Sequence, residues 1–276
     1  MYGTLLFAAL AFYGAGTLMT VPVVIRRRPV LSPASLGALG LGLLLHVTAM
    51  AVHAIEIHRL PLTDVRSALS FFSILSAIAF FLVYLRYRII SLGLFVFPLV
   101  FTLTFIAALQ PGHSFDSPSF RSGWLLVHIV TILLGYAGFF LTFVAAIMYL
   151  IQEKQLKSKR PSGLYYRLPS LEICDKLYYR SLLFGLPMLS VGLLMGFVWA
   201  SRTWHGPWEL DPKILAALIT WVIYLILFAT RASGGWSGRR SSYLAILGFA
   251  LVMVTFLGIS FVSGQHGYFP NLSNMP

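Results

Sequence analysis

Histidine is the residue of this sequence with the widest capacity for metal chemistry. It is the commonest metal ligand in proteins and a frequent axial ligand of haem iron. The seven copies are His46, His53, His58, His113, His128, His205 and His266. Haem held by any of them would be bound non-covalently, because the sequence has no Cys-x-x-Cys-His motif. Cys174 is the only cysteine, which also excludes an intrachain disulfide and thiol–disulfide exchange by this chain alone.

A second chemical cluster is aromatic and charged and lies in a tryptophan-rich segment at about residues 199–213. Its members are Trp199, Arg202, Trp204, His205, Trp208, Glu209, Asp211 and Lys213. Tryptophan at a membrane interface is ordinarily an anchor. Beside histidines, the same flat rings could form a surface for a planar macrocycle. Composition leaves both interpretations open.

The elements that position these residues are predicted to be transmembrane helices. Of the 276 residues, 58% are hydrophobic and only 10% are charged. Apolar stretches long enough to cross a hydrocarbon core of about 30 Å recur along the chain. The sequence therefore predicts an all-α, polytopic integral membrane protein that forms one transmembrane domain over residues 1–276. We expect about eight helices, at 2–25, 35–57, 68–85, 89–110, 123–151, 182–203, 213–230 and 242–263.

The net charge of +12 is distributed unevenly along this topology. With both termini on the outer side, the inner loops carry fifteen of the twenty Lys and Arg residues. This asymmetry follows the positive-inside rule and favours contact with anionic lipid headgroups over nucleic-acid binding. The longest inner loop is predicted at about 152–180. It is basic and suits either a segment lying on the membrane or a docking site for a partner.

None of the seven histidines falls on the predicted inner side. His128 lies about one turn into its helix from the outside, and His53 about one turn from the outer end of its own. His46 lies near the bilayer middle. Because His46 and His53 are seven residues apart, they share a helix face. Either could be functional, as intramembrane ionisable residues often are, or could hydrogen-bond to neighbouring helices. Gly192 and Gly196 have the spacing of closely packed helices.

Several segments together resemble the haem-handling proteins of cytochrome c assembly, the superfamily of the CcsA/ResC and CcmC types. The tryptophan-rich segment is similar to the family's WWD signature, and the similarity extends over about residues 46–268. The matching residues are Pro61, Leu62, Thr63, Asp64, Ser122, Trp124, His128, Tyr136, Trp204, Trp208, Asp211, Pro212, Lys213, Trp221, Gly235, Trp236, Gly264, His266 and Tyr268.

The resemblance implies b-type haem held between His128 and His266 on the extracytoplasmic side of a cell (inner) membrane. Trp204 and Trp208 would pack against the ring. Further members of the implied site are Trp124, Asp211, and the cations Arg121, Arg202 and Lys213, of which the cations would pair with the haem propionates. His46 and His53 are secondary candidates.

This sequence departs from the family pattern at four positions. Leu210 replaces a tryptophan, Ile214 and Ser67 replace glutamates, and Ala229 replaces a histidine. With these losses and a length of 276 residues, the chain resembles the smaller HemX/YpjD-like branch more than a complete synthase subunit.

Three functions follow from these features. The first is a haem chaperone for cytochrome c maturation, working with another biogenesis membrane protein or an apocytochrome. The second is a haem-free structural or regulatory subunit that acts on a haem-biosynthesis or respiratory partner. The third is a transporter or redox protein that uses His46 and His53 for protons or a second haem. No nucleophile or acid–base pair stands out, so we expect no enzyme activity from the chain alone.

Overall fold

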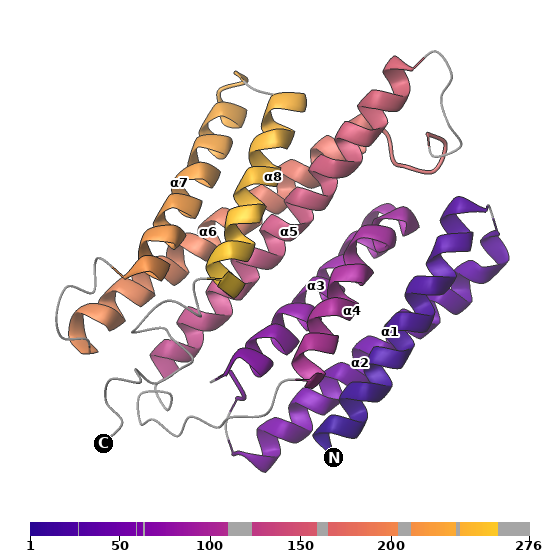
Figure 1. Cartoon of the computed structure of the whole chain (residues 1–276). Helices are drawn as coiled ribbons and strands as arrows, with labels where there is room; N and C mark the ends of the chain where they lie inside the picture. The colour runs from indigo at the N-terminus through magenta and orange to yellow at the C-terminus, as the bar shows by residue number, and fades with distance from the viewer. Residues whose placement is uncertain are drawn as a thin grey trace. The chain divides into compact units, whose positions relative to one another are not determined.

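The computed structural model of the chain contains helices and no strands in the part that it describes. That part comprises residues 1–26, 28–58, 60–62, 64–109, 123–158, 165–203, 211–235 and 238–258. Eight helices within these ranges are long and apolar enough to cross a membrane (Figure 1). The predicted all-α, multi-pass architecture is therefore confirmed. The predicted outer location of both termini stays a prediction.

The helix bounds follow the predicted order. They are α1 (Tyr2–Ile25), α2 (Ser32–Glu56), α3 (Val65–Tyr87), α4 (Gly93–Leu109), α5 (Gly123–Lys157), α6 (Leu171–Thr203), α7 (Pro212–Ala232) and α8 (Arg239–Met253). Short 3₁₀ turns at Pro29–Leu31 and Ile90–Leu92 precede α2 and α4, and a π-helical segment, Val254–Gly258, follows α8.

The division between α3 and α4 depends on Arg88. Its backbone is left-handed, with φ of 57°, and its N–H donates to the carbonyl of Tyr84. A left-handed residue after the last turn is a common helix stop because it cannot continue a right-handed helix. The break therefore falls where the sequence predicts it.

The bounds predicted for the loop at 152–180 were wrong. α5 continues to Lys157 and α6 already begins at Leu171. A span predicted from hydropathy ends at the first charged residues. The helix itself can continue beyond them, because Gln, Glu, Lys and Leu are good helix formers. With 35 and 33 residues, α5 and α6 are each about 50 Å long at about 1.5 Å per residue, which exceeds the apolar core of a bilayer.

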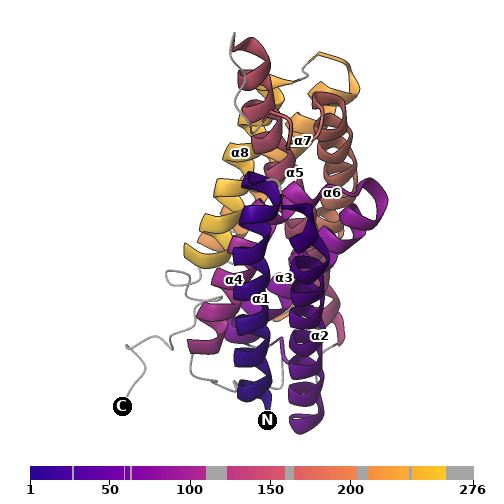
Figure 2. The same ribbon diagram turned by 90° about the vertical axis from the view of Figure 1, so that its right-hand side faces the viewer.

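The chain divides into two compact units, and the prediction of a single domain stays a prediction. Unit 1 contains α1 to α4 together with the stretch from Ile151 to Cys174. Within it α1 packs on α2 and α4, and α3 packs on α4 (Figures 1 and 2). Its interior includes the fully buried rings of Tyr13, Phe72, Phe80 and Phe97.

Unit 2 contains α5 up to Leu150, α6 from Asp175, α7 and α8. Glycine allows α5 and α6 to approach closely, because a Cβ atom on Gly138 would lie 2.9 Å from the Cα of Gly185. The ring of Phe139 on α5 stacks on Tyr224 of α7, with centroids 3.5 Å apart. Small residues at such crossings are typical of membrane bundles, where close packing replaces the hydrophobic effect.

Candidate functional site

The described part of the candidate site lies at one end of unit 2. His128 and Trp124 are in the first two turns of α5, the glycines opposite them are in the last turns of α6, and Asp211 precedes α7. Figure 1 shows these three helix ends at the same end of the unit. The bundle therefore gathers residues that are about 90 positions apart in the sequence.

The imidazole of His128 is oriented by the backbone of α6. Its Nδ1 atom lies 2.7 Å from the carbonyl oxygen of Gly192. A carbonyl only accepts hydrogen bonds, so in the neutral ring Nδ1 carries the proton and Nε2 carries the lone pair. Metal-bound histidines commonly have this arrangement, in which one ring nitrogen donates to a backbone carbonyl and the other faces the metal.

Two glycines of α6 make room for this part of α5. A Cβ atom on Gly196 would lie 2.6 Å from Cε1 of His128, and one on Gly192 would lie 2.6 Å from a methyl carbon of Ile132. Both distances are shorter than those of real Cβ atoms, so a side chain at either position would have to displace its neighbour. The predicted close helix packing at Gly192 and Gly196 is thus confirmed, and Gly196 forms the wall against which the imidazole lies.

Trp124 is one turn before His128 and also contacts α6. Its indole Nε1–H donates to the carbonyl oxygen of Met195 at 2.9 Å, and 44% of the residue is exposed. The hydrogen bond fixes the orientation of the indole while part of the ring remains accessible. Trp124 and His128 are therefore held by consecutive turns of the same helix.

Asp211 has a structural role that the sequence prediction did not include. Asp211 is buried, and its Oδ1 accepts hydrogen bonds from the backbone N–H groups of Lys213 and Ile214, at 2.9 and 3.3 Å. This is the N-cap arrangement, in which a side-chain oxygen accepts from the first orphan donors of a helix. Asp211 thus fixes where α7 begins. Arg202 lies exposed in the last turn of α6.

Four predicted site residues lie outside the described residues. They are His266, Trp204, Trp208 and Arg121. Of the predicted set, the structure brings His128 and Trp124 together against α6.

The secondary candidate His46 lies in the core of unit 1, fully buried. Its Nε2 is 2.6 Å from the hydroxyl of Ser70, and Nδ1 is 3.5 Å from the hydroxyl of Tyr13. These contacts join α1, α2 and α3. Both ring nitrogens have hydroxyl neighbours, which is how buried polar groups are normally accommodated. The geometry favours the interpretation of His46 as a polar link between helices.

His53, the other secondary candidate, has a different environment. It is partly exposed and stacks on the ring of Tyr2, with centroids 4.6 Å apart, and its Nδ1 is 4.0 Å from Glu56. Among the residues that the structure describes, no group of three or more His, Cys, Asp or Glu is arranged to hold a metal ion.

Sequence reasoning missed the relation between Gly196 and His128. The glycine spacing indicated close packing, but only the pairing of α5 with α6 reveals which residue fills the space. The carbonyl of Gly192 was equally inaccessible to prediction, because a backbone acceptor has no sequence signal of its own.

Comparison with known proteins identifies the family of this chain. The family described as cytochrome c assembly protein matches residues 33–266. The cytochrome c biogenesis protein CcsA of Guillardia theta is 32% identical over 237 residues, and the match covers 78% of this chain and 78% of the relative. The CcsA protein of Mesostigma viride is 29% identical over 245 residues, covering 79% of this chain and 80% of the relative. The narrower HemX/YpjD-like assignment is not confirmed. The chain belongs to the cytochrome c assembly protein family.

Proposed function

We propose that this membrane protein is a haem chaperone for cytochrome c maturation, and that it holds b-type haem between His128 and His266. Membership of the family supports the role in cytochrome c maturation. The observation that carries the haem assignment is the hydrogen bond between Nδ1 of His128 and the carbonyl of Gly192. With Nδ1 as the donor, Nε2, the usual iron-binding atom, is the ring nitrogen that carries the lone pair.

The described residues fit such a group in three respects. His128 is fixed in the required tautomer, Gly196 leaves space at the imidazole, and Trp124 offers a partly exposed aromatic ring. When bound between two imidazoles, haem has no open coordination position, which suits storage and transfer better than oxygen activation. The role of the chain is then to bind haem, to orient it and to release it.

The remaining site residues come from the family resemblance. In this proposal His266 supplies the second imidazole, and Trp204 and Trp208 pack against the macrocycle. Arg121, Arg202 and Lys213 offer cations for its two carboxylates, since Arg and Lys bind carboxylates by charge-assisted hydrogen bonds. The site faces the extracytoplasmic side of a cell membrane, where an apocytochrome or another biogenesis protein would receive the haem.

Visible spectroscopy on the detergent-purified chain tests the proposal. The parent protein, loaded with haem, should show a Soret band and sharp α and β bands after dithionite reduction. The double variant His128→Ala/His266→Ala should lose or strongly alter these bands. His58→Asn is the matched control, because it removes an exposed histidine of unit 1 that is not a candidate haem ligand, and Asn tolerates the positive φ of this position. It should leave the spectrum unchanged.

A parent protein that stays colourless after haem is added would contradict the proposal. The haem-free alternative would then be preferred, and co-purification of a stable membrane partner would support it.

A further inference from the structure

One end of unit 1 contains two buried polar atoms without a hydrogen-bond partner in the described part of the chain. They are Oε1 of Gln152 and Nε of Arg167. Gln152 is only 5% exposed. Buried polar groups are nearly always paired, so an unpaired acceptor and an unpaired charged donor in one region call for a ligand.

The two side chains belong to the same small region. Nε2 of Gln152 donates to the carbonyl of Tyr165 at 3.2 Å, which assigns the amide orientation and directs Oε1 elsewhere. Arg167 follows Tyr165 by two residues, so their Cα atoms are at most about 7 Å apart. A guanidinium nitrogen of Arg167 also donates to the carbonyl of Ile25. The end of α5, the end of α1 and the segment before α6 therefore meet here.

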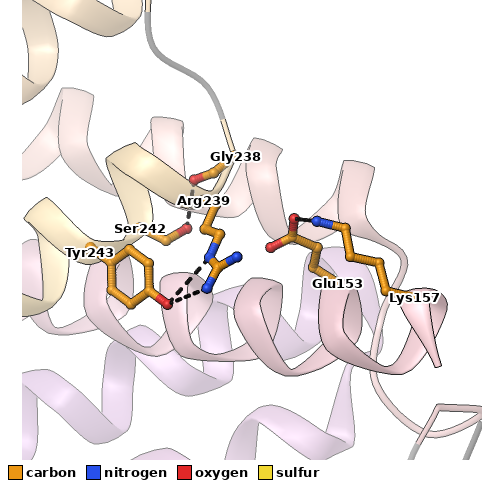
Figure 3. Close-up of polar contacts among 6 residues, drawn as sticks. All are labelled: Glu153, Lys157, Gly238, Arg239, Ser242 and Tyr243. Atoms are coloured by element: carbon orange, nitrogen blue, oxygen red, sulfur yellow. Dashed lines mark hydrogen bonds and ion pairs between the residues drawn. The ribbon is translucent and has the colours of Figure 1, made fainter.

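This region carries an excess of positive charge. Its described residues between 151 and 174 include the basic Lys154, Lys157 and Arg167 and two acids, and Arg26 and Arg28 follow the end of α1. Of the two acids, Glu153 is bonded to Lys157 at 2.6 Å (Figure 3), and Glu172 lies in the first turn of α6. The field at Arg167 therefore favours an anion.

The position along the helix indicates where that anion comes from. α1 is an apolar span that ends at Ile25, which is 51% exposed, and basic residues begin directly after it. Such a change from apolar to basic residues marks the depth of the lipid headgroups. A soluble anion would have to enter this layer, whereas a phospholipid phosphate already occupies it.

We propose that this region binds the headgroup of an anionic phospholipid that also carries hydroxyl groups, of the phosphatidylglycerol type. The phosphate accepts from Nε of Arg167, and a headgroup hydroxyl donates to Oε1 of Gln152. The ligand thereby satisfies one donor and one acceptor, which a zwitterionic choline headgroup does not. This site is independent of the proposed haem site.

Native mass spectrometry of the full chain in neutral detergent tests the proposal. The delipidated protein is titrated with phosphatidylglycerol, phosphatidylcholine or phosphatidic acid of identical acyl chains. Phosphatidylglycerol should bind with one tight site per chain. Arg167→Gln should weaken that binding about tenfold or more, as expected for a lost charge-assisted hydrogen bond.

Two further variants make the test specific. Gln152→Met removes the acceptor without changing charge, and it should abolish the preference for phosphatidylglycerol over phosphatidic acid. Arg86→Gln is the matched control, because Arg86 is a basic residue of unit 1 that packs on Tyr87. It should retain the tight site.

The proposal is overturned if Arg86→Gln and Arg167→Gln weaken binding equally, since charge alone would then explain it. It is also overturned if the parent does not distinguish phosphatidylglycerol from phosphatidic acid. Displacement of the lipid by soluble glycerol phosphate at the same concentration would assign the site to a soluble anion instead.

Discussion

Gly196 of α6 faces the imidazole of His128 so closely that a methyl group on it would lie 2.6 Å from Cε1. The histidine therefore keeps its position only while residue 196 has no side chain. Because helix backbones resist displacement, the imidazole itself would have to move.

We therefore expect Gly196→Ala to disturb the haem spectrum of the loaded protein. The Soret band should shift or lose intensity, while far-ultraviolet circular dichroism stays that of a helical protein. Gly37→Ala in α2 is a suitable control, since no atom lies within 4 Å of a Cβ at that position. An unchanged Soret band in Gly196→Ala would argue against His128 as a ligand.

Gly138→Ala should destabilise unit 2 without touching the candidate site. The added methyl would meet backbone atoms of Gly185, which cannot rotate away. Overpacking of this kind costs about 1–3 kcal/mol. Thermal unfolding in detergent should show a lower midpoint than for the parent. A midpoint equal to that of the parent would mean that the two helices separate easily at this crossing.

His46→Ala distinguishes a structural role of this residue from a role as a second haem ligand. The change leaves the hydroxyls of Tyr13 and Ser70 without their histidine neighbour in a buried core. An unsatisfied buried group costs about 1–3 kcal/mol, so the unfolding midpoint should fall. The haem content per chain should remain that of the parent. A halved haem content would instead favour the third hypothesis, a second haem at His46.

Arg231 and Asp175 form an ion pair between α7 and α6, and the guanidinium also lies near the rings of Tyr178 and Tyr179. Asp175→Asn and Arg231→Gln should each lower the free energy of unfolding. The double variant should lose less of this free energy than the sum of the two single losses. A coupling free energy of about 1 kcal/mol is expected for residues in direct contact. Chemical denaturation of all four proteins measures it, and strict additivity would exclude the pairing.

The sequence predicts local features of the fold better than long-range ones. Composition and hydropathy are sufficient to predict the eight helices. The end of α3 at Arg88 is predicted by Arg86 and Arg88, which separate two apolar segments. The predicted end of α5 and the predicted start of α6 were wrong because both helices continue into charged residues beyond their apolar stretches.

The candidate site shows the same limit. Trp124 and His128 could be paired from their spacing of four residues on one helix. Their partners, the carbonyls of Met195 and Gly192, lie more than sixty residues away and depend on how two helices pack. The capping role of Asp211 was accessible in principle, since Asp before Pro at a helix start is a known signal.

The contact between Arg167 and the carbonyl of Ile25 has a consequence for biogenesis. These residues are 142 positions apart, and a chain emerges from the ribosome with its N-terminal part first. The carbonyl of Ile25 therefore lacks this partner until α5 and the segment after it have been synthesised. Unit 1 therefore completes its packing at this end only after the segment before α6 has been synthesised.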